Sequence, residues 1–203
     1  MEEVSSPTRI TDLLFASADK WPAKPAISFN GKTQDWLETK NRCIAAATLL
    51  KELGVNPGDR VAFLGLNSNV CFESYWSPAL IGASMVPVNY RLAVREMIEC
   101  VQDCSPVVLI VDPNFLDHAQ QIKESCLSLI SIVSCGEIAA PEGMVSYEDH
   151  INEIIGSESY AELTPSSDDD TVIIFYTGGT TGRSKGVMPV SYTHLTLPTN
   201  REV

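Results

Sequence analysis

The chain has 203 residues, of which 44% are apolar, and this composition is typical of a folded protein rather than a disordered one. Its 26 acidic residues against 14 basic residues give a net charge of −12, so most of its surface would repel a nucleic-acid backbone. The longest apolar runs, such as Val107 to Val111, are far shorter than the roughly 20 residues that span a bilayer, so we expect no membrane span.

The first clear element is a helix over residues 35–53. Leu37, Ile44 and Leu50 fall on one face of it, and Asp35 followed three residues later by Glu38 resembles a capping box. The stretch "RVAFLGL" at residues 60–66 is too continuously apolar for a half-exposed strand. We therefore predict a buried strand there.

Helices and strands then alternate along the chain. We predict helices over residues 70–82, 94–104 and 115–126, and strands over residues 84–89, 106–112 and 130–135. Strands that alternate with helices at this spacing imply parallel pairing with right-handed crossovers. The sequence therefore predicts an α/β fold, a mostly parallel sheet flanked by helices.

A linker and a glycine-rich loop follow. Residues 156–170 read as a linker, and the β-branched run "TVIIFY" at residues 171–176 leads into "TGGTTGRSKG". Glycines let several backbone N–H groups approach one anion, while hydroxyl groups and a lysine add donors that suit phosphate. The candidate phosphate-binding residues are Thr177, Gly178, Gly179, Thr180, Thr181, Gly182 and Lys185.

Two other interpretations of this loop can be compared with it. The P-loop pattern G-x-x-x-x-G-K-[ST] fails, because the sixth position counted from Gly178 or Gly179 is Arg183 or Ser184. A glycine-rich hairpin without any ligand is the plainer alternative, since such turns are common. The three threonines and the lysine among the glycines favour a phosphate site.

"YTGGTTGRSKGV" closely resembles the signature loop of the adenylate-forming enzymes, usually seen as Y-[ST]-[SG]-G-T-T-G-x-P-K-G-V. Ser184 stands where that pattern has proline. "DWLETKNRCIAAATLLKELGVNPGDRVAFLGLNS" and "ALIGASMVPVNYRL" resemble earlier regions of the same family, in the same order. "WLETKNRC" and "VPVNYRL" look most like plant-type acyl-activating ligases, which make acyl-CoA from medium-chain, benzoate-like or related acids.

The resemblance implies an AMP-forming acid–CoA ligase of carboxylic-acid or fatty-acid metabolism. A carboxylate attacks the α-phosphate of Mg²⁺-bound ATP to form an acyl-adenylate and pyrophosphate, and the thiol of coenzyme A then displaces AMP. It also implies that the seven loop residues contact the nucleotide, with Lys185 stabilising charge on the leaving pyrophosphate. The partners implied are ATP, Mg²⁺, coenzyme A and a small carboxylic acid.

The resemblance runs from about Thr8 to Val187, so we assign residues 1–187 to the N-terminal portion of the adenylation domain, and residues 188–203 do not resemble the family. We interpret that tail as translated cloning sequence or an alternative exon. Family motifs expected downstream, including a catalytic lysine, do not occur, so no intact catalytic residue is predicted. We therefore expect an incomplete N-terminal part of the ligase fold, inactive by itself. The alternative is a non-catalytic module, derived from the ligase, that binds a nucleotide or a partner.

The remaining signals concern metals and location. The six cysteines are scattered without a C-x-x-C pair or neighbouring histidines, which argues against a zinc site and favours reduced thiols. The acidic N-terminus has no basic region followed by an apolar run, as a secretory signal would. We expect no metal-ligating residues and a cytoplasmic or peroxisomal protein.

Overall fold

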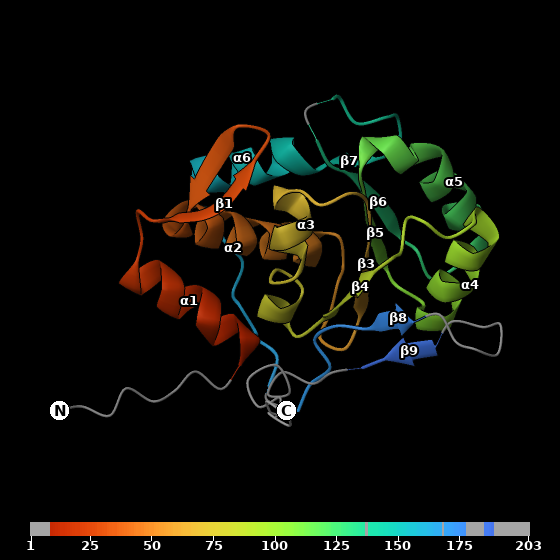
Figure 1. The fold of residues 1–203 in the computed structure, drawn as a ribbon, viewed down its shortest axis with the longest axis horizontal. Helices are drawn as coiled ribbons and strands as arrows, with labels where there is room; N and C mark the ends of the chain where they lie inside the picture. The colour runs from red at the N-terminus through yellow and green to blue at the C-terminus, as the bar shows by residue number, and fades with distance from the viewer. Residues whose placement is uncertain (1–8, 137, 168, 178–184, 189–203) are drawn as a thin grey trace, which may run out of the picture.

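The computed structural model describes residues 9–136, 138–167, 169–177 and 185–188. Its centre is a five-stranded sheet in the order β4-β3-β5-β6-β7, in which every neighbouring pair is parallel (Figure 1). The predicted α/β class with a parallel sheet is confirmed. The strands are β3 (Arg60–Leu64), β4 (Ser84–Pro87), β5 (Val108–Val111), β6 (Ser131–Ser134) and β7 (Val145–Ser146).

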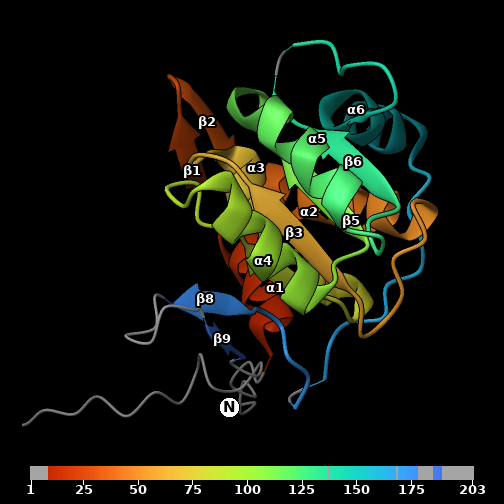
Figure 2. The same cartoon turned by 90° about the vertical axis from the view of Figure 1, so that its right-hand side faces the viewer.

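Helices cover both faces of this sheet (Figure 2). Strand β3 shows why, since Val61 and Phe63 belong to one core cluster, and Ala62 and Leu64 to another. Successive side chains of a strand point to opposite faces, so a strand buried on both faces is apolar throughout. The first cluster includes residues of α1 (Ile10–Lys20), α2 (Trp36–Glu52), α3 (Asn69–Ser74) and α6 (Tyr147–Ser157), and the second includes residues of α4 (Val94–Cys104) and α5 (Leu116–Ser125).

The N-terminal region contains a hairpin that we did not predict. Strands β1 (Pro25–Phe29) and β2 (Lys32–Asp35) are antiparallel, and Asn30 and Gly31 between them have φ values of 49° and 75°. Two positive φ angles are what a two-residue hairpin turn requires, and Asn-Gly is its strongest sequence signal. The hairpin leads directly into α2, whose first turn is capped by Asp35, which accepts a 2.8 Å hydrogen bond from the Glu38 amide.

The predicted helix over residues 70–82 is wrong in its second half. Helix α3 ends at Ser74, and a separate 3-10 turn, η1 (Ala79–Ile81), follows. Pro78 lies between them, and a proline supplies no backbone N–H and clashes with the preceding turn of a helix. The predicted helix over residues 94–104 matches α4, and α5 is preceded by a 3-10 turn, η2 (Pro113–Phe115).

The chain after α6 returns to the β4 edge of the sheet. The amides of Thr164 and Ser166 donate to carbonyls of η1, at 3.1 and 2.8 Å. Met85 of β4 then exchanges two 2.9 Å hydrogen bonds with the next stretch: its amide donates to Val172, and its carbonyl accepts from Ile174. Because Val172 is fully buried, this stretch covers the edge of β4 and fixes the direction in which the chain leaves the sheet.

Candidate functional site

The predicted phosphate loop is held at both ends by a short hairpin. Strands β8 (Phe175–Thr177) and β9 (Lys185–Val187) are antiparallel, and Thr177, the last residue of β8, pairs with Lys185, the first residue of β9. The structure therefore brings two of the predicted site residues together. The other five, Gly178, Gly179, Thr180, Thr181 and Gly182, lie outside the described residues.

One side chain connects this hairpin to the body of the protein. The hydroxyl of Tyr176 donates a 2.5 Å hydrogen bond to Oδ2 of Asp103, in the last turn of α4. Burial, followed by the interaction with Asp103, raises the pKa of the Tyr176 phenol above its ordinary value. The phenol therefore keeps its proton at neutral pH and remains the donor in this bond.

Gly186 of β9 makes room for the Tyr176 ring. A Cβ atom added at Gly186 would lie 3.2 Å from Cγ2 of Ile174 and 3.5 Å from Cζ of Tyr176. Tyr176 and Gly186 are also directly paired across the hairpin, so the ring covers its partner strand where that strand has no side chain. This glycine, which the sequence offered as part of a phosphate motif, has a packing role in the described structure.

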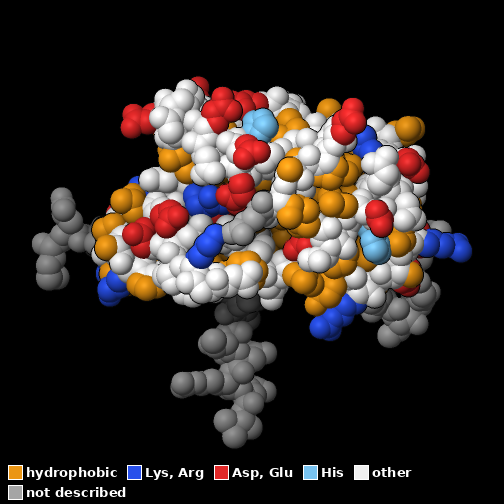
Figure 3. All heavy atoms as spheres, turned by 90° about the horizontal axis from the view of Figure 1, so that it is seen from above, with side chains coloured by type: hydrophobic (Ala, Val, Ile, Leu, Met, Phe, Trp, Pro, Cys, Tyr) orange, Lys and Arg blue, Asp and Glu red, His pale blue; other side chains and the backbone are white. Residues whose placement is uncertain are grey.

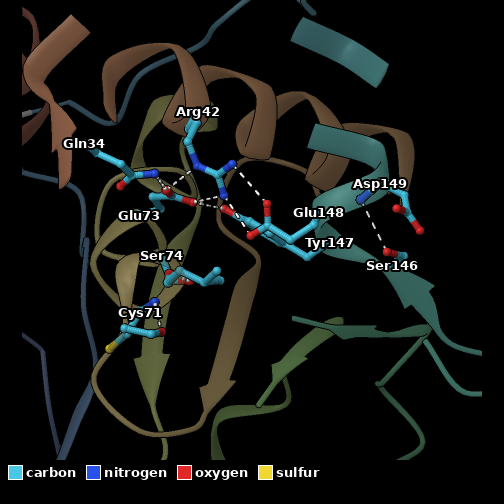
Figure 4. Close-up of polar contacts among 11 residues, drawn as sticks. Gln34, Arg42, Cys71, Glu73, Ser74, Ser146, Tyr147, Glu148 and Asp149 are labelled. Carbon is cyan, nitrogen blue, oxygen red and sulfur yellow. Dashed lines mark hydrogen bonds and ion pairs between the residues drawn. The ribbon is translucent and has the colours of Figure 1, made fainter. Parts of the chain in front are cut away.

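A buried polar network lies elsewhere, at the junction of α2, α3 and α6 (Figure 4). Nε of Arg42 donates to Glu73 at 2.6 Å, and Nη2 of Arg42 donates to Glu148 at 2.9 Å. The Tyr147 hydroxyl and the Gln34 amide donate to Glu73 at 2.8 and 3.3 Å. Figure 4 shows the Arg42 guanidinium between the two carboxylates. Glu73 is fully buried, so this network is a structural element rather than an open site.

The ionisation of this network follows from its burial. Burial alone would lower the pKa of Arg42, but its hydrogen bonds and the charge of Glu73 outweigh that effect, and the pKa lies above its ordinary value. Burial and the Glu73 charge raise the pKa of Tyr147 well above its usual range. Our sequence reasoning missed the network, because its members are 31 and 106 positions apart and form no motif.

Apolar features of the described surface lie away from the hairpin and the buried network. A hollow of about 290 Å³ lies between β1 and α3, lined mainly by apolar side chains that include Ile27, Phe29 and Phe72. Hydrophobic side chains also gather on the face seen in Figure 3, among scattered acidic ones. Within the described residues, no three His, Cys, Asp or Glu side chains are grouped as a metal site would need, and no helix is long and apolar enough to cross a membrane.

Comparison with known proteins relates this geometry to a family. A family model described as "AMP-binding enzyme" matches residues 14–197. A feruloyl-CoA synthase from Amycolatopsis sp is 31% identical over 167 residues, which cover 82% of this chain and 30% of that protein. An indoleacetate–CoA ligase from Aromatoleum aromaticum is 32% identical over 168 residues, which cover 82% of this chain and 32% of that protein.

A solved structure supports the same family relationship. The crystal structure of the anthranilate CoA ligase AuaEII in complex with anthranoyl-AMP is similar, with a TM-score of 0.81 and 27% identity. The similarity covers 94% of this chain and 36% of that one. The chain spans about a third of the length of the curated relatives it matches. The plant-type branch and the nucleotide contacts of the loop residues stay predictions.

Proposed function

This chain belongs to the AMP-binding enzyme family, and from that premise we propose that its β8–β9 hairpin serves the ATP-dependent activation of a carboxylic acid. The single observation that carries the proposal is the pairing of Thr177 with Lys185, which closes the glycine-rich segment into one loop. The pairing supports the proposal because it brings the two ends of the segment together, and successive backbone N–H groups of a turn form concavities that bind anions.

The proposed reaction has two steps. A carboxylate oxygen of the acid forms a bond to the α-phosphorus of Mg²⁺-bound ATP, and the bond from that phosphorus to the bridging oxygen breaks, releasing pyrophosphate. The sulfur of coenzyme A then forms a bond to the acyl carbon, AMP leaves, and the thiol proton is lost. In this proposal Thr177, the other loop residues and Lys185 stabilise the negative charge that develops on the departing pyrophosphate.

We further propose that residues 1–203 bind the nucleotide but do not complete the reaction. The chain spans about a third of the relatives it resembles, so most of a relative's length has no counterpart in it. The relatives' names refer to feruloyl, indoleacetate and anthranilate, and benzoate-like or medium-chain acids are the substrates predicted for this branch. The cytoplasmic or peroxisomal location stays a prediction.

Two measurements test this proposal. Titration calorimetry with Mg-ATP should give saturable binding, and Lys185→Ala should weaken it by about tenfold, because a charged donor to phosphate is lost. Lys20→Ala, which removes an exposed lysine at the end of α1, serves as the control and should leave binding unchanged. Equal affinities for the Lys185 variant and the parent would remove Lys185 from its proposed role.

Pyrophosphate release addresses catalysis separately. With a panel of benzoate-like and medium-chain acids, the chain should release no more pyrophosphate from ATP than a reaction without acid. Release that depends on the acid would contradict the proposed inactivity and would identify the substrate at the same time.

A further inference from the structure

The hairpin that carries the proposed phosphate loop needs support from outside itself. Each of its strands has three residues, and an isolated two-stranded hairpin of this size is marginal in water. Its outer face is also open to solvent, since the side chains of Phe175, Val187 and Met188 are exposed. The position of the loop therefore depends on how β8 and β9 are attached to the body of the protein.

Tyr176 provides that attachment through two kinds of contact. Its ring packs on the core cluster that lies beneath α4, and its hydroxyl donates to Asp103 at 2.5 Å. A hydrogen bond to a carboxylate is stronger than one between neutral groups. Because Thr177 is the next residue in the chain, the contact acts one residue from the start of the loop.

The helix end that receives Tyr176 is itself fixed to the sheet. Arg60 of β3 donates from Nε to the Cys104 carbonyl at 2.7 Å and from Nη2 to the Ser105 carbonyl at 2.9 Å. These carbonyls are among the unpaired acceptors at the C-terminus of α4, so the guanidinium also opposes the negative end of the helix dipole. A continuous path of contacts thus runs from β3 through the end of α4 to the hairpin.

We propose that Tyr176 and Asp103 form a positioning pair that holds β8, and through it Thr177 and the backbone of Lys185, in register for phosphate binding. This inference rests on the nucleotide-binding role proposed above. Neither side chain needs to contact the nucleotide. Asp103 carries a negative charge at the negative end of the α4 dipole, which is unfavourable. A hydrogen bond from the Tyr176 hydroxyl stabilises the carboxylate in that position.

The experiment uses the whole 203-residue chain and compares four single variants, together with the double variant that combines Tyr176→Phe and Asp103→Ala. Tyr176→Phe removes only the hydroxyl, Asp103→Ala removes the acceptor, and Asp103→Asn keeps an acceptor oxygen. The matched control is Tyr160→Phe, which alters a tyrosine that is 39% exposed. Two quantities are measured for each variant: the dissociation constant for Mg-ATP, and the hydrogen-exchange rates of the amides in β8, β9, β3 and β5.

We expect Tyr176→Phe and Asp103→Ala to raise the dissociation constant about five- to tenfold, with no further loss when the two are combined. Exchange should accelerate in β8 and β9 and stay unchanged in β3 and β5, which shows that the variants remain folded. Asp103→Asn should fall between the parent and Asp103→Ala, and Tyr160→Phe should match the parent.

The two proposals fail in different ways. If Tyr176→Phe leaves exchange in β8 and β9 unchanged, or if it leaves Mg-ATP affinity unchanged while exchange accelerates, the positioning role is overturned. If the parent chain binds no Mg-ATP, the proposed function fails for this chain. Accelerated exchange in β8 and β9 would then still support the structural attachment, and unchanged exchange would overturn it.

Discussion

Among the polar contacts that join distant segments of the described chain, two differ clearly in burial. Arg42 and Glu73 meet across α2 and α3 with 9% and 0% of their side chains exposed, whereas Tyr176 and Asp103 meet at the surface. In a buried pair, removal of one partner leaves a charge that neither water nor protein compensates. At the surface, water replaces part of the lost interaction, so the loss is smaller and stays local. The first contact therefore governs the stability of the whole fold, and the second governs the local placement of one hairpin.

The largest effect is expected from breaking the buried contact. Arg42→Met keeps most of the volume but leaves Glu73 charged and buried, so the free energy of unfolding should fall by about 3–5 kcal/mol. Urea denaturation followed by circular dichroism measures this loss. The control is Arg95→Met, which breaks an exposed pair with Glu99 and should cost less than about 0.5 kcal/mol. Equal losses of unfolding free energy in the two variants would mean that burial does not determine how much each ion pair stabilises the fold.

The next prediction concerns the pH dependence of stability, to which two buried cysteine thiols contribute. Burial raises the pKa of Cys104, beside the Tyr176 contact, and of Cys135, in the body of the fold, from 9.0 to about 12. The folded chain thus keeps these protons to higher pH than the unfolded chain. The two protonated thiols therefore contribute fully to the stability of the fold below pH 9, and this contribution is lost as pH rises toward 12. At a pH midway between these two pKa values, the titration of each thiol should have lowered the free energy of unfolding by about 2 kcal/mol.

Urea midpoints measured across this alkaline range check the prediction. Cys104→Ala and Cys135→Ala should each flatten the decline, because each removes one thiol whose titration couples to unfolding. Burial also raises the pKa of Cys43 and of Tyr147, so part of the alkaline loss of stability should remain in both variants. A decline with the same slope in the parent and in both variants would contradict the assignment.

The smallest effect tests the packing of the hairpin beside the surface contact. Gly186→Val adds a residue with high strand propensity, yet its side chain would meet Ile174 and Tyr176, so we expect a loss of about 1 kcal/mol confined to the hairpin. Hydrogen exchange in β8 and β9 measures this local opening. Gly186→Ala should cost less, because one carbon needs only a small shift of its neighbours. Slower exchange in the valine variant would show that strand propensity outweighs the packing conflict.

Much of the fold could be predicted because its signals are local. The run from Arg60 to Leu64 is apolar at every position after the first, and this alone indicates a strand buried on both faces. Helix α4 was predicted with its observed bounds, since the spacing of Met97, Val101 and Cys104 marks one buried face. The helix predicted over residues 70–82 does not continue through Pro78, because proline supplies no backbone N–H to the helix. The β1–β2 hairpin was missed although Asn30 and Gly31 signal it.

The candidate site divides in the same way. The order of glycines, threonines and lysine between Thr177 and Lys185 predicts a phosphate loop and indicates the family, because a phosphate loop is built from consecutive residues. The contact between Tyr176 and Asp103 joins residues 73 positions apart, and no spacing rule relates them. Only the packing of β8 beside the end of α4 brings them together.

The sequence by itself determined the α/β class and the main strands, because each depends on side chains close together in the chain. The tertiary structure alone decided the strand order, the burial of Glu73 beside Arg42, and the attachment of the hairpin through Tyr176. These features depend on segments that meet only after the backbone has closed long loops, and their energies come from burial that no short stretch of sequence contains.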